Sequence, residues 1–228
     1  MMKKATVSYQ GFRFSKLNDP RFSHLKLLLF WPPCLILFFI TGHLIPQASC
    51  TPMHMWLDDV ILFCEWFLIP YVFWYLLVAF TLLYFLRYDV DCFKRLQTYI
   101  AIAQLVSTVV YIVWPTCHEL RPDFAALGRD NLLIDGVKLL YSVDTTQNAC
   151  PSLHVSLAIG IAIEWCRYKG SSRLWKVLMI LTALLICMST AFVKQHSAVD
   201  FFGALPLVLV AQIAVSLIYR KKVGEAVQ

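Results

Sequence analysis

The chain has 228 residues, of which 59% are hydrophobic and only 15% are charged. Soluble domains carry about a quarter charged residues, so this composition, with a mean hydropathy of +0.65, excludes an ordinary soluble domain and predicts an all-α membrane protein. The net charge of +6 is typical of basic cytoplasmic loops and does not indicate a nucleic-acid partner. The eight cysteines form no CxxC pair and no metal-finger spacing, which favours small core residues over a structural metal site.

Six apolar segments have the length of membrane helices, and they follow a polar N-terminal segment. Residues 1–25 are basic and are expected to form a cytoplasmic tail, and the first apolar run is expected to be a signal anchor rather than a cleaved leader. Residues 26–228 are expected to form one six-helix membrane domain without internal repeats. The predicted helices cover residues 26–45, with a kink at Pro32-Pro33, then 65–86, 96–114, 151–167, 174–193 and 197–219.

Three of the connections between these helices are informative. Residues 53–64 place Asp58 and Asp59 among apolar side chains and are interpreted as an amphipathic segment at the membrane interface. Residues 87–95 are interpreted as a charged loop, and residues 116–150 form the longest polar segment of the chain.

The distribution of Lys and Arg predicts how the helices are oriented. Sixteen of the twenty basic residues lie at or before residue 26, in residues 87–95, in residues 167–176 or after residue 219. The positive-inside rule then places both termini in the cytoplasm and puts residues 115–151 and 189–200 on the extracytoplasmic face. Four basic residues remain on that outer face, namely Arg121, Arg129, Lys138 and Lys194.

A cation, an imidazole and a carboxylate meet in the stretch 189–200, between the last two apolar segments. Ionisable groups beside hydrocarbon are costly and are usually functional. If the chain after Lys194 is helical, His196 and Asp200 lie four residues apart on one face. Asp200 would then orient the imidazole and leave its other ring nitrogen free as a nucleophile. A lone histidine here is more often structural, and a His/Asp pair also suits a metal, but the nearby cations Arg121 and Lys194 favour an anion.

The second polar cluster is Pro151-Ser152-Leu153-His154, at the start of the fourth apolar segment. Proline suits the first position of a helix, and the free N–H groups that follow it form an anion site with the positive end of the helix dipole. The Ser152 hydroxyl adds a donor, and His154 is placed to protonate a leaving oxygen. The alternative is that Ser152 only caps the helix and that His154 only marks the membrane interface.

The remaining cluster follows the helix predicted over 96–114 and contains Arg121, whose planar guanidinium suits a phosphate. Taken alone, Arg121 is more simply explained as a surface residue paired with Glu119 or Asp123. All three clusters, however, emerge at helix ends on the same predicted face. Their convergence, more than any one motif, predicts a single site for a phosphoryl group.

These clusters resemble the three signatures of the type 2 phosphatidic acid phosphatase (PAP2) superfamily, which are K-x6-R-P, P-S-x-H and S-R-x5-H-x3-D. Arg121-Pro122 matches the end of the first signature, and residues 151–154 match the second completely. Ser189, His196 and Asp200 match most of the third. The motifs occur in the family's order and at its expected helix ends.

Two positions depart from the family's pattern. The lysine of the first signature falls at Trp114, and the arginine of the third falls at Thr190. Two phosphate-binding cations of the family are therefore missing, and Lys194 is the expected stand-in. This variant of the motifs is similar to the branch that includes inositol phosphorylceramide synthase-like enzymes.

The resemblance implies a role for each residue of the site. His196 would attack phosphorus and become a phosphohistidine, with Asp200 orienting its ring, and His154 would protonate the leaving group. Neither a metal nor another cofactor would be required. The residues expected to bind the phosphoryl oxygens are Arg121, Ser152, Leu153 and Lys194.

The function that this resemblance implies is a lipid phosphatase of the cell membrane, with its active site on the extracytoplasmic side. Its substrate would be a lipid phosphate, such as a phosphatidate, a phosphatidylglycerol phosphate or a polyprenyl diphosphate, and its other contacts would be membrane lipids. A phosphotransferase that passes the headgroup to an alcohol uses the same chemistry and is the first alternative. A non-catalytic transporter or scaffold is the second. The oligomeric state is left open.

One covalent link is also suggested by position. Cys117 and Cys150 lie at the two ends of the polar segment 116–150, on the predicted outer face, where oxidation is permitted. A disulfide between them would contribute roughly 3–4 kcal/mol in the chain-entropy model. Two unpaired thiols are an equally acceptable alternative.

Overall fold

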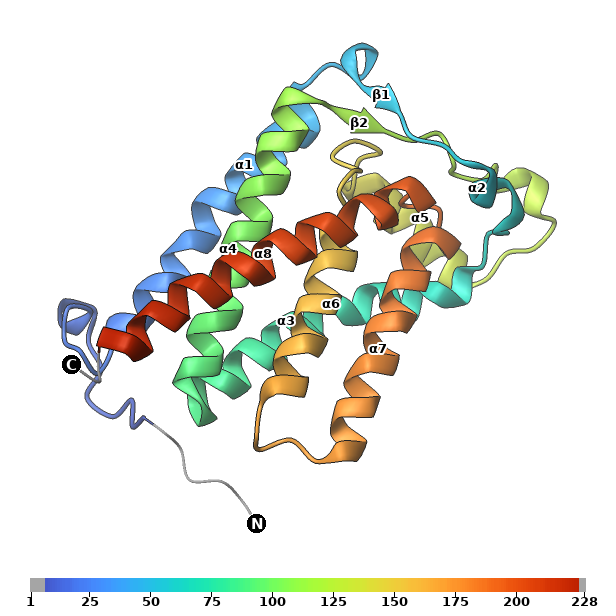
Figure 1. The fold of residues 1–228 in the computed structure, drawn as a ribbon. Coiled ribbons are helices and arrows are strands. Elements are labelled where there is room, and N and C mark those ends of the chain that lie inside the picture. The colour runs from blue at the N-terminus through green and yellow to red at the C-terminus, as the bar shows by residue number, and fades with distance from the viewer. Residues whose placement is uncertain (1–6, 226–228) are drawn as a thin grey trace.

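The computed structural model (Figure 1) describes residues 7–225, apart from the side chains at 47 and 221–225. Residues 1–6, which belong to the expected basic tail, and residues 226–228 lie outside the described residues. The α-helices are α1 Trp31–Leu44, α2 Trp56–Val60, α3 Leu68–Tyr88, α4 Val90–Val113, α5 Leu132–Val143, α6 Leu153–Arg167, α7 Arg173–Phe192 and α8 Ala198–Glu225. Short 3-10 helices are η1 Phe14–Lys16, η2 Ser23–Phe30, η3 Gln47–Ser49, η4 Glu65–Phe67 and η5 Ala125–Leu127, and the two strands, β1 Thr51–Pro52 and β2 Thr116–Cys117, pair in parallel.

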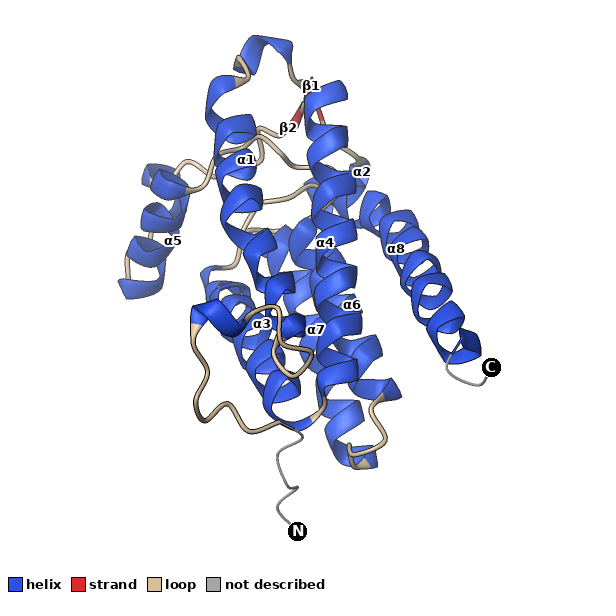
Figure 2. Cartoon of the chain, turned by 90° about the vertical axis from the view of Figure 1, so that its left-hand side faces the viewer, coloured by secondary structure: helices blue, strands red, loops and turns tan. Residues whose placement is uncertain are grey.

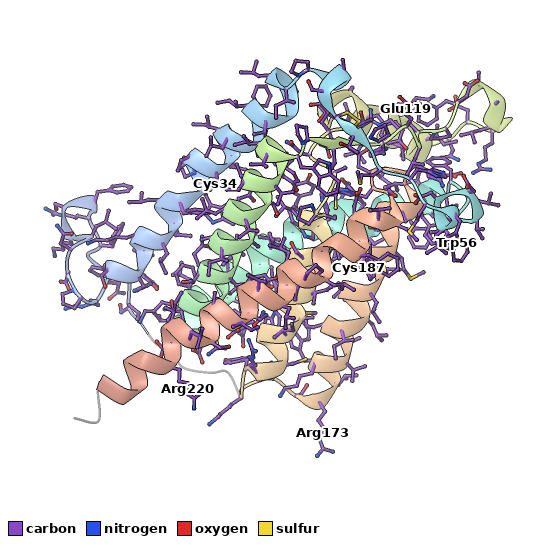
Figure 3. The ribbon with its side chains drawn as sticks, turned by 45° about the horizontal axis from the view of Figure 1, so that its top comes forward. Cys34, Trp56, Glu119, Arg173, Cys187 and Arg220 are labelled. Carbon is purple, nitrogen blue, oxygen red and sulfur yellow. A yellow bond between two sulfur atoms is a disulfide. The ribbon has the colours of Figure 1, made fainter. Side chains whose placement is uncertain are left out.

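The helix ends form two groups at opposite ends of the bundle. The start of α1, the α3–α4 and α6–α7 connections and the end of α8 lie in the lower part of Figure 1, and β1, β2, α2, α5 and the α7–α8 junction lie in the upper part. Arg173 and Arg220 point away from the bundle at the first end, whereas Glu119 lies at the second (Figure 3). The three polar clusters of the sequence are thus gathered at one end.

Five segments of the described chain are helices long and apolar enough to cross a membrane, namely Ser23–Leu44, Glu65–Tyr88, Val90–Val113, Arg173–Phe192 and Ala198–Arg220. The all-α prediction is confirmed, and five of the six predicted helices have the length of a membrane span. The other helix, α6, has only 15 residues, or about 22 Å of length. Most of its side chains are buried among the other helices.

Helix α4 fixes the position of α6 along the axis of the bundle. The hydroxyl of Tyr111 donates to the carbonyl of Pro151, and the hydroxyl of Tyr99 donates to the carbonyl of Ser156, each over 2.7 Å. Gly160 allows this close approach, because a Cβ at that position would lie 2.1 Å from the Tyr99 ring. These contacts hold the first turn of α6, which carries His154, at a defined position.

The prediction of a charged loop over residues 87–95 is wrong. Helix α3 continues to Tyr88 and α4 starts at Val90, so that Asp89 alone separates them. The carboxylate of Asp89 accepts a hydrogen bond from the N–H of Cys92 over 3.0 Å and caps α4. Aspartate is a strong N-cap residue, which explains why a charged stretch begins a helix here.

The polar segment 116–150 contains a helix that the sequence analysis did not predict. Helix α5 is capped by Asn131, whose side-chain oxygen accepts from the N–H groups of Leu133 and Ile134. Its buried face is formed by Ile134, Val137 and Leu140, which have helical spacing. Figure 2 shows α5 and α8 on opposite sides of the bundle.

Part of the expected tail is packed against the bundle. Phe22 and His24 are buried, and the hydroxyl of Tyr9 contacts the ring of His24 and donates to the carbonyl of Leu86, each over 2.8 Å. The described residues before α1 therefore cover the α3–α4 end, which lies opposite the polar clusters.

Candidate active site

The turn between α7 and α8 places an imidazole beside a carboxylate. The carbonyl of Thr190 accepts hydrogen bonds from the N–H groups of Gln195 and His196, which ends α7. Nδ1 of His196 lies 3.2 Å from Oδ2 of Asp200, and the same oxygen accepts from the N–H of Ser197 over 2.9 Å. Because Nδ1 faces the carboxylate, Nε2 is the ring nitrogen left for a substrate.

The second imidazole, that of His154, comes from the first turn of α6. Its ring stacks between two aromatic rings of α3, with centroid distances of 4.3 Å to Tyr71 and 4.1 Å to Trp74. The His154 and His196 rings are 6.0 Å apart, so both can contact one small group between them. Nε2 of His154 is buried without a hydrogen-bond partner in the described chain.

Both histidines line a cavity of about 530 Å³. Its walls are mostly apolar side chains of α1, α3 and α4, reaching from Phe38 to Trp31 along α1 and from Trp74 to Leu82 along α3. Most of its polar lining gathers with the two histidines, namely Asp144, Thr145, Gln147, Asn148 and Gln195. The cavity therefore suits a molecule with a polar head and an apolar chain.

The start of α6 contributes in two ways. The Ser152 side chain is fully buried and caps the helix by accepting from the N–H of Val155, while its own N–H donates to the carbonyl of Asp200. Ser152 does not line the cavity, but Leu153 and His154 do. The N-terminal end of α6 thus faces the cavity, and its dipole favours an anion there.

The guanidinium of Arg121 is held by three acceptors just behind the cavity. It donates to the carbonyls of Tyr141 and Asp144 and to Oε1 of Gln195, and it lies 4.2 Å from the centre of the Tyr141 ring. It forms no ion pair with its acidic neighbours in the described chain. Nε is buried without a partner, and burial lowers the Arg121 pKa. Gln195, which lines the cavity, connects this cation to it.

Lys194 points away from the cavity. Its ammonium donates to the main-chain carbonyl of Asp58 over 2.6 Å, and its pKa is lowered by burial, an effect that Asp58 and Asp59 oppose. The two positions where the PAP2 signatures have cations supply no charge either. Trp114 donates to the hydroxyl of Thr51, and the Thr190 hydroxyl bonds within its own helix.

His118 is a site residue that the sequence analysis missed. It follows β2, only 1% of it is exposed, and neither ring nitrogen has a hydrogen-bond partner of good geometry among the described residues. Burial, with further contributions from His196 and Arg121, lowers its pKa to about 3, whereas the Gln195 backbone opposes the shift. The only sequence signal was its position three residues before Arg121.

Unpaired polar atoms are concentrated at this site. Ten buried side-chain nitrogen or oxygen atoms have no hydrogen-bond partner in the described chain, and six of them belong to His118, Arg121, Gln147, His154 and Asp200. Buried polar atoms in proteins are nearly always paired, so their clustering favours a polar ligand at this position. Within residues 7–225, no group of three or more His, Cys, Asp or Glu side chains is arranged to hold a metal ion.

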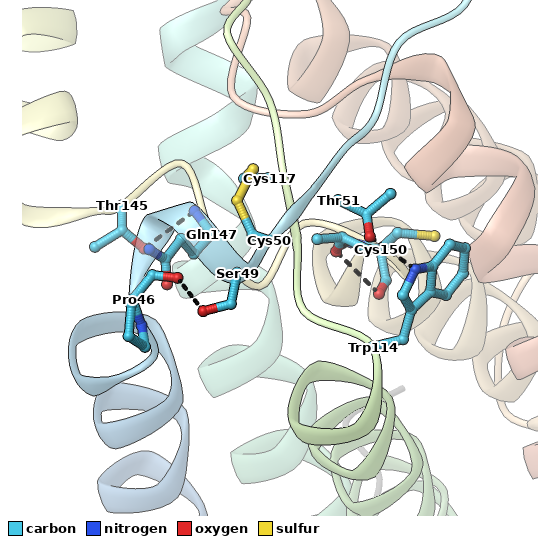
Figure 4. The surroundings of a disulfide bond; sticks show 10 residues. Pro46, Ser49, Cys50, Thr51, Trp114, Cys117, Thr145, Gln147 and Cys150 are labelled. Atoms are coloured by element: carbon cyan, nitrogen blue, oxygen red, sulfur yellow. Dashed lines mark hydrogen bonds between the residues drawn. A yellow bond between two sulfur atoms is a disulfide. The ribbon is translucent and has the colours of Figure 1, made fainter.

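The disulfide that position suggested between Cys117 and Cys150 does not form. Cys117 is bonded to Cys50, with a Cα–Cα distance of 5.8 Å, and Cys150 is a buried free thiol that lies apart from this bond (Figure 4). The parallel pairing of β1 and β2 brings Cys50 next to Cys117. The N–H of Cys150 instead donates to the hydroxyl of Thr116.

Replacing Cys50 by Ser is expected to lower the thermal unfolding temperature in detergent. The bond joins residues 67 apart in sequence, and a loop of that length contributes about 4 kcal/mol in the chain-entropy model. Reduction should raise the intact mass of the wild-type protein by about two units, and it should leave the mass of the Cys50→Ser variant unchanged. Cys150→Ser is the matched control and should keep the reductant-sensitive mass. A wild-type mass that is insensitive to reductant would contradict the bond.

Comparison of the chain with protein-family models, with curated proteins and with solved structures found no match. Any proposal for the function of this chain therefore rests on the geometry of the site.

Proposed function

We propose that this protein is a membrane lipid phosphatase that hydrolyses a phosphomonoester or diphosphate of a lipid through a phosphohistidine intermediate. The observation that carries the proposal is the meeting of His154 with the His196–Asp200 pair at the polar end of an otherwise apolar cavity. A nucleophile with an orienting carboxylate, opposite a second imidazole, is the arrangement that acid-assisted nucleophilic catalysis requires.

The reaction proceeds in two displacements. Nε2 of His196 attacks phosphorus while the bond from phosphorus to the lipid oxygen breaks, and a protonated His154 gives its proton to that oxygen. Water then attacks the phosphohistidine, His154 accepts a proton from this water, and inorganic phosphate leaves with His196 restored. Asp200 holds Nδ1 through both steps and stabilises the positive ring that forms, as the carboxylate of a serine triad does.

Negative charge on the phosphoryl oxygens needs fixed donors near the cavity. Among the predicted phosphate ligands, Leu153 lines the cavity at the positive end of α6, and Arg121 lies behind Gln195. The His118 ring, which is neutral because burial lowers its pKa, can add one N–H donor beside them. A preorganised donor in direct contact with the phosphoryl oxygens is worth about 3–4 kcal/mol of transition-state stabilisation. Arg121 and His118 do not line the cavity, so they act on it at longer range. Ser152 and Lys194 act from outside the cavity, by holding the chain on which the histidines lie.

The membrane topology that fits this function has six spans and cytoplasmic termini. The buried α6 is the sixth span, and the basic residues counted in the sequence then lie at the end opposite the site, as Arg173 and Arg220 do in Figure 3. The site faces the extracytoplasmic side. The apolar cavity walls of α1 and α3 receive the lipid chain.

A phosphotransferase is the second candidate function, and one observation favours it. Beside the two histidines, the cavity is lined by hydroxyl, amide and carboxylate side chains from the α5–α6 connection, namely Asp144, Thr145, Gln147 and Asn148. Such groups suit a hydroxyl-rich acceptor. An alcohol bound there would attack the phosphohistidine in place of water.

The purified protein is expected to release phosphate from a lipid phosphate in the presence of a chelator, at the rate seen without it. The test uses phosphatidate, phosphatidylglycerol phosphate and a polyprenyl diphosphate in detergent micelles, each with and without inositol or diacylglycerol. Release of inorganic phosphate supports the phosphatase, and formation of a phosphorylated acceptor supports the transferase. Strict dependence on an added divalent ion would contradict the mechanism, and inactivity on every substrate would favour the transporter or scaffold.

A further inference from the structure

The segment between β1 and α3 crosses the end of the bundle at which the two histidines lie. It is fixed at its start by the Cys50–Cys117 disulfide and by β1. Near its end the N–H of Cys64 donates to the carbonyl of Phe192, the last residue of α7, over 3.0 Å. We call residues 50–65 the strap. The sequence suggested a segment lying in the membrane interface, but the strap is also tied to the turn that carries His196.

Asp58 makes the central contacts of the strap. It is 4% exposed, and Oδ1 accepts from the N–H of Ala198 over 2.8 Å. Oδ2 accepts from the hydroxyl of Ser197 and, within the strap, from the N–H of Met55. Because Ala198 is the first residue of α8, this carboxylate supplies a capping acceptor at the positive end of that helix from a distant part of the chain.

The same residue also holds the other side of His196. The main-chain carbonyl of Asp58 accepts from the ammonium of Lys194 over 2.6 Å. Lys194 has a φ of 54°, a left-handed conformation that residues with a Cβ rarely adopt, so its side-chain contact supports an otherwise unfavourable backbone. Asp58 therefore forms hydrogen bonds on both sides of His196, with Lys194 before it and with Ser197 and Ala198 after it.

We propose that Asp58 is a positioning residue that holds His196 with Nε2 toward the cavity. The inference rests on the proposed function, since it assigns Asp58 to the nucleophile of that reaction. In this arrangement Lys194 helps to hold the turn through its hydrogen bond to Asp58 and is not a phosphate ligand. Positioning matters because a nucleophile displaced by about 1 Å can lose about 100-fold in rate. The adjacent Asp59 has no such role: it is exposed and its carboxylate pairs with His54 over 2.9 Å.

The test compares Asp58→Asn with Asp59→Asn in the full chain. The first variant keeps the side-chain shape but loses the charge and one acceptor, so kcat on a lipid phosphate is expected to fall about 10- to 100-fold. KM should stay within about 3-fold, because the cavity itself is unchanged. Asp59→Asn should match the wild type in both constants. A wild-type kcat in Asp58→Asn would overturn the inference while leaving the phosphatase proposal intact.

Backbone hydrogen exchange gives a second readout that does not depend on activity. In Asp58→Asn the peptides covering residues 193–200 should exchange at least about 10-fold faster, while those of α6 keep the wild-type rate. Ser197→Ala removes one hydrogen bond to Asp58 and should accelerate hydrogen exchange in the same peptides. Unchanged exchange, or an equal acceleration throughout α3 to α8, would overturn a positioning role, even if the wild type proved inactive on every lipid.

Discussion

Replacing His196 by Asn is expected to abolish phosphate release, with a fall in kcat of at least about 10⁴-fold. Asparagine cannot form the covalent intermediate, and no other imidazole nitrogen in the described chain combines access to the cavity with an orienting carboxylate. The lipid should still bind, because the apolar walls of the cavity are unaffected. The measurement is the initial rate of inorganic phosphate release from the best substrate of the panel.

His43→Asn is the matched control, because His43 is an exposed histidine of α1 that stacks on Phe39 and is absent from the cavity lining. It should keep the wild-type rate. The intermediate itself can be sought by alkaline quenching and mass spectrometry of the peptide that contains His196. A phosphate found on His154 in place of His196 would reverse the two roles, and full activity in His196→Asn would end the phosphohistidine mechanism.

Replacing His154 by Asn is expected to slow turnover of a lipid phosphate by about 10²- to 10⁴-fold, the range typical of a lost general acid. The effect should depend on the leaving group. An aryl phosphate such as p-nitrophenyl phosphate leaves without needing a proton, so its first step should be nearly unaffected. The second step still lacks its base. The expected result is a burst of nitrophenolate equal to the amount of enzyme, followed by slow turnover.

Equal losses on the lipid phosphate and the aryl phosphate, without a burst, would show that His154 is not the acid. That outcome would instead fit a structural role for its stacking between Tyr71 and Trp74. The thermal unfolding temperature of His154→Asn is expected to fall in either case, because the ring is buried and packed. The difference between the two substrates and the presence of a burst therefore separate the two explanations.

The parts of the fold and site that the sequence could predict are local. Hydropathy over about twenty residues indicates helices of membrane length, and the capping of α6 by Ser152 follows from residues next to one another in the chain. The His196–Asp200 contact is expected from a four-residue spacing on a helix, but α8 starts only at Ala198. His196 lies in the turn before that helix, so the pair forms at the helix end and not on one helix face. The break at Asp89 is also local, but a charged stretch indicates either a loop or a helix cap, and only the structure shows that Asp89 is a cap.

The parts that could not be predicted are contacts between distant segments. Asp58 and Ser197 are 139 residues apart, and no periodicity in either segment indicates that they meet. The same holds for Cys50 and Cys117, which are 67 residues apart: position alone suggested Cys150 as the partner of Cys117, and Cys150 is a free thiol. The direction of the Lys194 side chain depends on the left-handed backbone of Lys194 itself. The sequence therefore shows that a positive charge lies here but not that it contacts the carbonyl of Asp58.

The short length of α6 has a consequence for how deep the chemistry lies. The hydrocarbon core of a bilayer is about 30 Å thick, and the 15 residues of α6 cover about 22 Å. If its Arg167 end lies at the inner boundary of the core, its first turn lies about 8 Å beneath the outer boundary. For the proposed phosphatase, a substrate headgroup would then have to move below its neighbours in the leaflet to reach His154. Lipids with small headgroups would do so at the lowest desolvation cost, so the depth of the site would itself select among substrates that share one phosphate chemistry.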